Sequence, residues 1–153
     1  MSLIEWDSTY ALGLKDVDEH HQHLVSQLNR LYDGIVYNET VDVDDVFIEL
    51  VEYAKNHFDL EEKLMLDSKY QGYKSHVEKH SEFISNILEL QNKYHSGNAY
   101  VDTDTMLYLK DWLFNHILKA DKKYLRSIQL LQENKIVSVV KLLTQLSQLV
   151  IIV

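Results

Sequence analysis

Two pairs of residues in this sequence have the spacing that lets side chains on one helix share a metal ion. His57 and Glu61 are four residues apart, and so are His76 and His80. Residues four apart lie on one face of a helix, with Cβ atoms roughly 5–6 Å apart. Each pair can therefore offer two ligands to one metal ion or to one pair of metal ions.

Three further residues extend this candidate set. His116 and Asp121 are five apart near the end of a predicted fourth helix, an angular fit looser than four, and His21 adds an imidazole from the first helix. Imidazole with carboxylate favours Fe, Mn, Zn or Cu. Seven such ligands suit two metal ions bridged by the carboxylates better than one. The full set is His21, His57, Glu61, His76, His80, His116 and Asp121.

Ordinary packing competes with this interpretation, because one H-x-x-x-H match often arises by chance and a lone helical histidine is usually structural or solvent-exposed. The joint pattern is stronger than its parts, since the candidates lie among core aliphatics where an unpaired His or Glu is costly. No Glu is followed three residues later by His, which argues against a ferritin-like oxidase site. The H-E-x-x-H string of zinc proteases is also absent.

The composition indicates a few long helices joined by short loops. The chain has 153 residues, 46% of them apolar, with no proline and four glycines, whereas sheet-rich proteins need many turn residues. The absence of cysteine excludes a disulfide framework, a zinc–thiolate site, an iron–sulfur cluster and a cysteine nucleophile. A net charge of −9 argues against nucleic acid as a partner.

Apolar residues recur at helical spacing in four segments. We expect helices from about residue 18, from a cap at Asp42 or Asp44, over about 73–95, and from a cap at Asp102 or Thr103. Breaks are expected at 38–40, 68–72 and 96–98. Short loops favour antiparallel neighbours. The predicted fold is therefore all-α, an up-down-up-down four-helix bundle behind an irregular N-terminal arm over 1–16.

We divide the chain into a bundle domain, 1–125, and a C-terminal amphipathic helical extension, 126–153. A four-helix bundle is closed without this extension, so its apolar face must pack on a groove, a second subunit, another protein or a membrane surface. The heptad-like seam predicts self-association or partner docking through Val139, Leu142, Leu146 and Leu149.

The extension is too short and too often interrupted by polar residues for a membrane span. The first residues show no secretory signal, so a cytoplasmic location is the default expectation.

Several longer motifs carry a resemblance to a known family over about residues 4–126. They are WD at 6–7, Gly13, VDEHH at 17–21 followed by Leu24, HFDLEE at 57–62, HVEKH at 76–80 and DWLFNHILKADKKY at 111–124. In order, spacing and flanking residues, this set resembles the hemerythrins, in their bacterial branch.

The resemblance implies a four-helix bundle that binds O2 reversibly at a non-haem di-iron centre. The cofactor would be two iron ions (Fe2+/Fe3+) joined by an oxo or hydroxo bridge. His76, His80 and His116 would hold one iron. His21 and His57 would hold the other, and Glu61 and Asp121 would bridge them. Trp112, Leu113 and Ile117 match the family's O2 pocket, although ordinary bundle core is an equally simple interpretation.

Three other histidines lie outside the candidate set. His20 stands beside His21, and we choose His21 as the ligand because it lies three residues before Leu24 on the buried face. His23 and His95 match no ligand position and are expected at the surface.

Four functions compete for a site of this kind. We favour O2 binding, as a carrier, store or scavenger, and do not expect an enzyme. The alternatives are an oxygen or redox sensor that signals through the C-terminal helix, a di-iron enzyme acting on peroxide or nitric oxide, and iron or zinc storage.

Overall fold

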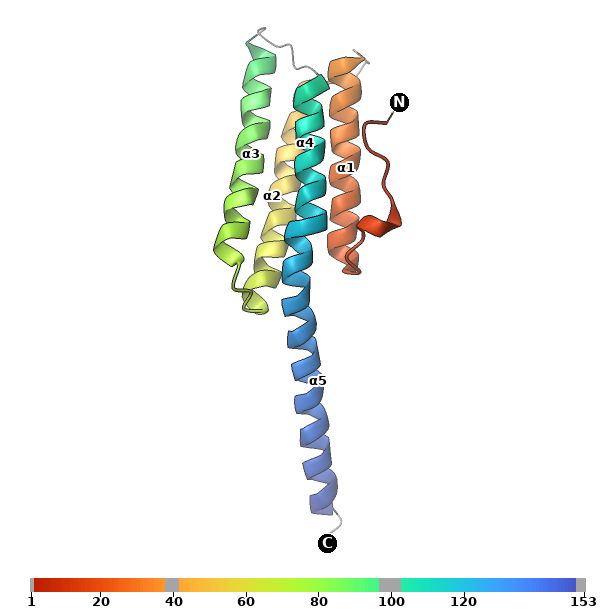
Figure 1. The fold of residues 1–153 in the computed structure, drawn as a ribbon, viewed down its shortest axis with the longest axis vertical. Helices are drawn as coiled ribbons and strands as arrows, with labels where there is room; N and C mark the ends of the chain where they lie inside the picture. Colours follow the sequence, from red (N-terminus) through yellow and green to blue (C-terminus); the bar gives the residue numbers. More distant parts are fainter. Residues whose placement is uncertain (1, 38–41, 97–102, 151–153) are drawn as a thin grey trace.

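The computed structural model describes residues 2–37, 42–96 and 103–150, and these form a helical bundle with one long projecting helix (Figure 1). A 3-10 turn, η1 (Ser8–Tyr10), lies in the N-terminal arm. The helices are α1 (Lys15–Val36), α2 (Val43–Asp67), α3 (Tyr73–His95), α4 (Thr103–Asn115) and α5 (Lys122–Val150), with a π-helical segment, η2 (His116–Asp121), between the last two.

The first four helices run alternately up and down and pack around one apolar core (Figure 1). Each places an apolar stripe at helical spacing towards the others, as Leu24, Leu28 and Leu31 do from α1, where all three are fully buried. The predicted all-α four-helix bundle is thereby confirmed. Its N-terminal arm packs on this core through Trp6 and Tyr10.

The helix ends follow from local capping. Asp42 caps α2, because its carboxylate accepts hydrogen bonds from the backbone N–H groups of Asp44 and Asp45. Lys69 takes a positive φ of 54° in the turn between α2 and α3, within the break expected at 68–72. The expected break at 38–40, the Gly97–Asn98 cap and the Asp102 cap fall outside the described residues.

The arm before α1 is tied to the helix by Asp18. Its carboxylate accepts hydrogen bonds from the backbone N–H groups of Leu12 and Gly13, at 2.6 and 2.9 Å. Gly13 has a φ of +79°, a conformation that L side chains rarely adopt. This closed loop allows α1 to begin at Lys15, three residues earlier than the apolar pattern alone indicates.

The expected C-terminal helix is present as α5, and it is joined to the bundle without a break in the chain of helical residues. α4, η2 and α5 form one continuous rod (Figure 1). The first turns of α5 still pack on the bundle, where Tyr124 and Ile128 form a small cluster with Met65. Residues 132–146 are all exposed and extend past the end of the bundle (Figure 1). None of the helices in the described part of the chain is long and apolar enough to cross a bilayer.

Candidate metal centre

The structure brings all seven sequence-predicted ligands together in the bundle interior. Each is at most 3% exposed, although all are polar or charged. They come from the first three bundle helices and from the rod: His21 from α1, His57 and Glu61 from α2, His76 and His80 from α3, and His116 and Asp121 from η2.

Three imidazoles surround one side of the two carboxylates. The Nε2 atom of His80 lies 3.1 Å from Oε2 of Glu61, and those of His76 and His116 lie 3.6 Å from the same oxygen. Oδ1 of Asp121 lies 3.4 Å from His76 Nε2 and 3.1 Å from His116 Nε2. Glu61 with these three histidines has the grouping of a metal site.

The other two imidazoles, of His21 and His57, form a second group with Glu61. His21 Nε2 is 3.3 Å from Oδ2 of Asp121 and 3.9 Å from Oε1 of Glu61. His57 Nε2 is 3.7 Å from Oε2 of Glu61. Because each carboxylate faces both histidine groups, the arrangement suits two cations with two carboxylates between them.

The π-helical turn of η2 places His116 and Asp121 on one face. In an α-helix, residues five apart point about 140° away from each other. A π-helix closes its hydrogen bonds from i to i+5, so residues five apart align. This explains how the loosest pair in the sequence comes to have its ligand atoms 3.1 Å apart.

Burial sets the protonation of the ligands. It lowers the pKa of His57 to about 3 and that of His116 to about 4. Both imidazoles are therefore neutral at pH 7, which is the form that binds a metal. Burial and the charge of Glu61 raise the pKa of Asp121, whereas the surrounding imidazoles lower the pKa of Glu61 in spite of its burial.

Buried polar atoms without a partner support the fit of a metal pair. Both ring nitrogens of His21 and His57, Nε2 of His76 and both carboxylate oxygens of Asp121 have no hydrogen-bond partner. Leaving such atoms unsatisfied in a core costs roughly 1–3 kcal/mol each. Two cations would satisfy most of them at once, and imidazole with carboxylate is a donor set that suits iron.

Glu62 and Tyr124, to which the sequence analysis assigns no role, support the ligands. Oε1 of Glu62 lies 3.0 Å from Nδ1 of His80, which fixes the ring that presents Nε2 to the site. The Tyr124 hydroxyl donates a hydrogen bond of 2.6 Å to Oε1 of Glu61. Both lie inside the family-like motifs, and Tyr124 follows Asp121 by three residues, a helical spacing that could have signalled its place.

Replacing Tyr124 by phenylalanine is expected to weaken metal retention without unfolding the bundle. The change removes one hydroxyl and leaves the buried ring, so Glu61 loses its orienting donor. Outer-shell changes of this kind typically cost 10–100-fold in metal affinity. Competition against a chelator measures the loss. Tyr73→Phe in the same cluster is the control, and equal retention by the two variants would contradict the role of Tyr124.

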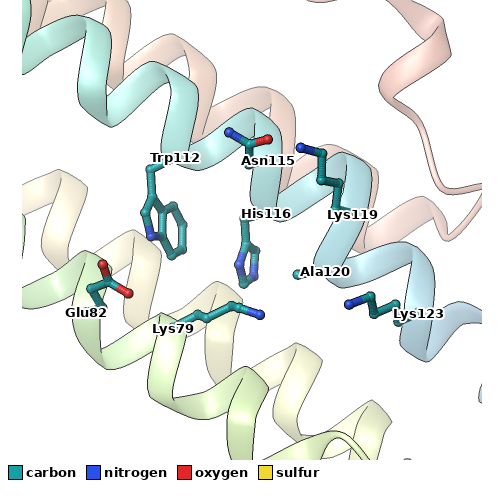
Figure 2. A pocket seen from close by; sticks show the side chains of 8 residues that line it. All are labelled: Lys79, Glu82, Trp112, Asn115, His116, Lys119, Ala120 and Lys123. Carbon is teal, nitrogen blue, oxygen red and sulfur yellow. The ribbon is translucent and has the colours of Figure 1, made fainter.

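The three predicted O2-pocket residues lie in different surroundings. Leu113 and Ile117 are buried in the main core. Trp112 is half-buried and stacks on His116 with ring centres 4.6 Å apart. With His116 it lines a cavity of about 520 Å³, whose rim carries lysines from α3 and from the rod (Figure 2). Trp112 therefore contacts the part of the site that holds His76, His80 and His116.

The remaining histidines follow the sequence-based expectations. His21 is fully buried, whereas its neighbour His20 is half-buried, with its ring against Tyr53. His23 and His95 are exposed as predicted, and His95 forms an ion pair with Asp44.

Fold and site together define a bundle protein built to hold a pair of metal ions in its core. Residues 12–128 match the model of the hemerythrin HHE cation-binding domain. The chain belongs to the hemerythrin family.

Several known proteins are similar to this chain over most of its length. It is 30% identical to a bacteriohemerythrin of Methylococcus capsulatus over 125 residues, 81% of this chain and 95% of that protein. It is 32% identical to a bacteriohemerythrin of Pseudomonas aeruginosa, with 84% of each covered. A crystal structure of wild-type hemerythrin superposes with a TM-score of 0.73 at 28% identity, covering 82% of this chain and 98% of that one.

Proposed function

We propose that this protein binds O2 reversibly at a non-haem di-iron centre, as a carrier, store or scavenger of O2. The observation that carries the proposal is the grouping of five buried imidazoles around two carboxylates, each of which faces both histidine groups. Membership of the hemerythrin family supports iron as the metal and O2 as the ligand.

We assign His76, His80 and His116 to one iron and His21 and His57 to the other. The distances support these groups, because one oxygen of Asp121 lies near His76 and His116 and its other oxygen lies near His21. They also support Glu61 and Asp121 as bridging carboxylates. When bound, the iron pair supplies the electrons by which O2 is taken up and returned.

The chain's own residues keep the site dry and its ligands fixed. Leu113 and Ile117 exclude water, and we propose that they form the O2 pocket together with Trp112. Tyr124 stays protonated, because burial and the charge of Glu61 raise its pKa, so its hydroxyl always donates to that carboxylate. Glu62 holds the ring of His80. These contacts suit a centre that binds and releases a ligand unchanged, so we do not propose an enzyme.

One observation favours a sensor as the second candidate function. His116 and Asp121 lie in η2, which continues into α5 without a break. A change of ligand geometry at the iron pair therefore acts on the same helix that leaves the bundle. We propose the division into a binding domain, 1–125, and an extension, 126–153, because residues 132–146 lie beyond the bundle and are all exposed.

An absorption spectrum tests the main proposal. The iron-loaded, anaerobically reduced protein is measured before O2 is added, after its addition and after its removal. A visible band that comes with O2 and goes with it is expected. Immediate conversion to a ferric spectrum that deoxygenation does not reverse would contradict reversible binding and favour an enzyme, a redox sensor or a store.

A further inference from the structure

The projecting part of α5, residues 132–150, carries a broad apolar stripe. It is called the arm in this subsection and is distinct from the N-terminal arm before α1. Within its described side chains every residue from 132 to 146 is exposed. Seven of them are large aliphatic residues with exposed fractions of 50–63%: Ile136, Val137, Val139, Val140, Leu142, Leu143 and Leu146. Three of the four docking positions expected from the sequence are among them, and the side chain of Leu149 lies outside the described part.

This amount of apolar surface approaches what a stable dimer needs. Val137 lies on the side opposite Leu146, so the stripe consists of the other six residues, which offer on the order of 500 Å² if each buries about 60–120 Å² of apolar surface. That value is at the upper end for the largest patch of a typical monomer, roughly 300–600 Å². A specific protein–protein interface buries about 800 Å² per partner, so the stripe supplies more than half of that area.

The direction of the stripe follows from helix geometry. Leu142 lies eighteen residues after Tyr124, and Leu146 lies eighteen after Ile128, which is five full turns of an α-helix. Tyr124 and Ile128 face the bundle core. The stripe therefore faces the space directly beyond the end of the bundle, in line with its core.

This direction decides how a partner helix can lie. A second arm running parallel in that space would continue upwards into the first bundle, because its own bundle precedes it in sequence (Figure 1). An arm that enters from the opposite end meets no such obstacle. Only the antiparallel arrangement lets two stripes face each other.

Charge supports the same arrangement. Residues 127–153 hold one acidic and two basic side chains, Glu133, Lys135 and Lys141, a net charge of +1, so the rest of the chain carries −10 of the total of −9. Two arms do not repel each other, whereas two bundles do. Antiparallel arms keep the bundles apart by more than the Debye length of about 8 Å at physiological salt. Two lysines in an acidic chain are also too few to hold the arm on an anionic membrane.

We propose that the stripe binds a second copy of this chain, arm against arm and antiparallel, to form a dimer with a bundle at each end. The spacing of Val139, Leu142 and Leu146 by three and four residues matches the seam of a two-stranded coiled coil. The inference is independent of the proposed O2 binding, because the arm contains none of the assigned ligands.

The test is the mass of the full chain in solution, measured by light scattering on the iron-loaded protein. The wild type is expected to have the mass of two chains, and the double variant Leu142→Lys with Leu146→Lys that of one. Val137→Lys is the matched control: Val137 is as exposed as Leu146 at 50%, but lies nine residues, or two and a half turns, from it on the opposite side. This variant should remain a dimer.

Iron content is the control for folding. Both variants should retain as much iron as the wild type if their bundles are folded. A monomeric wild type at the highest soluble concentration would overturn the proposal, and so would a double variant that stays dimeric. A monomer that sediments with phosphatidylglycerol vesicles would overturn it in favour of a membrane surface.

X-ray scattering tests the orientation. At 1.5 Å per residue, the rod from Thr103 to Val150 spans about 70 Å, so a parallel dimer is about 70 Å long, whereas the antiparallel dimer is about 110 Å long. The longer dimension is expected for the wild type. A two-chain particle of the shorter length would overturn the antiparallel arrangement.

Discussion

Replacing His57 or Glu61 by alanine is expected to reduce the iron content from two ions per chain to less than one. Glu61 is the larger of the two changes, because its carboxylate lies within 3.1–3.9 Å of the Nε2 atoms of all five ligand histidines. Without it the iron pair loses one of its two bridging carboxylates, and both ions lose a ligand. His57 is one of two imidazoles on its side, so its loss is expected to empty that side first.

Metal analysis of the purified, reconstituted variants measures this effect, with circular dichroism as the check that the bundle is still helical. His20→Ala is the matched control, since His20 is half-buried and its ring centre lies 5.7 Å from that of His57. It should retain both ions. Two iron ions per chain in both the His57 and the Glu61 variants would contradict the ligand assignment.

Removing the metal is expected to lower the melting temperature by on the order of 10 °C. A ligand present at 1,000 times its dissociation constant stabilises the fold by about 4 kcal/mol. For a chain of this size each kcal/mol shifts the midpoint by about 2–4 °C. The physical reason lies in the core, where stripping the site leaves buried nitrogens and the Asp121 oxygens without partners.

Calorimetry of the iron-loaded and the chelated protein measures the shift, and adding iron back should restore the higher midpoint. The Glu61→Ala variant serves as the control, because it is expected to show little change on chelation. Equal melting temperatures for the loaded and stripped wild type would show that the buried cluster is satisfied without metal.

The bundle and much of its site could be predicted from the sequence because both depend on helical periodicity. Pairs four residues apart, such as His57 with Glu61, share a face in any α-helix, so their convergence needed no tertiary information. The apolar stripes fixed which faces are buried, and hence favoured His21 over His20.

Other features depend on backbone geometry that periodicity does not encode. The π turn that aligns His116 with Asp121 replaces i→i+4 bonds by i→i+5 bonds, and the sequence alone showed only a loose spacing. The role of Tyr124 needed the distance between α2 and α5, which are far apart in the chain. The continuity of α4 with α5 is also not visible in the apolar pattern, because that pattern indicates a fourth helix and a further helix after it without showing whether the two are joined.

The unbroken rod also acts as a lever. Beyond Ile128, its last buried residue, the rod runs about 33 Å to Val150 at 1.5 Å per residue, so a tilt of about 5° displaces the far end by roughly 3 Å. A small change of ligand geometry at η2 therefore becomes a displacement of the C-terminal end of α5 that is as large as the distance between two atoms in contact.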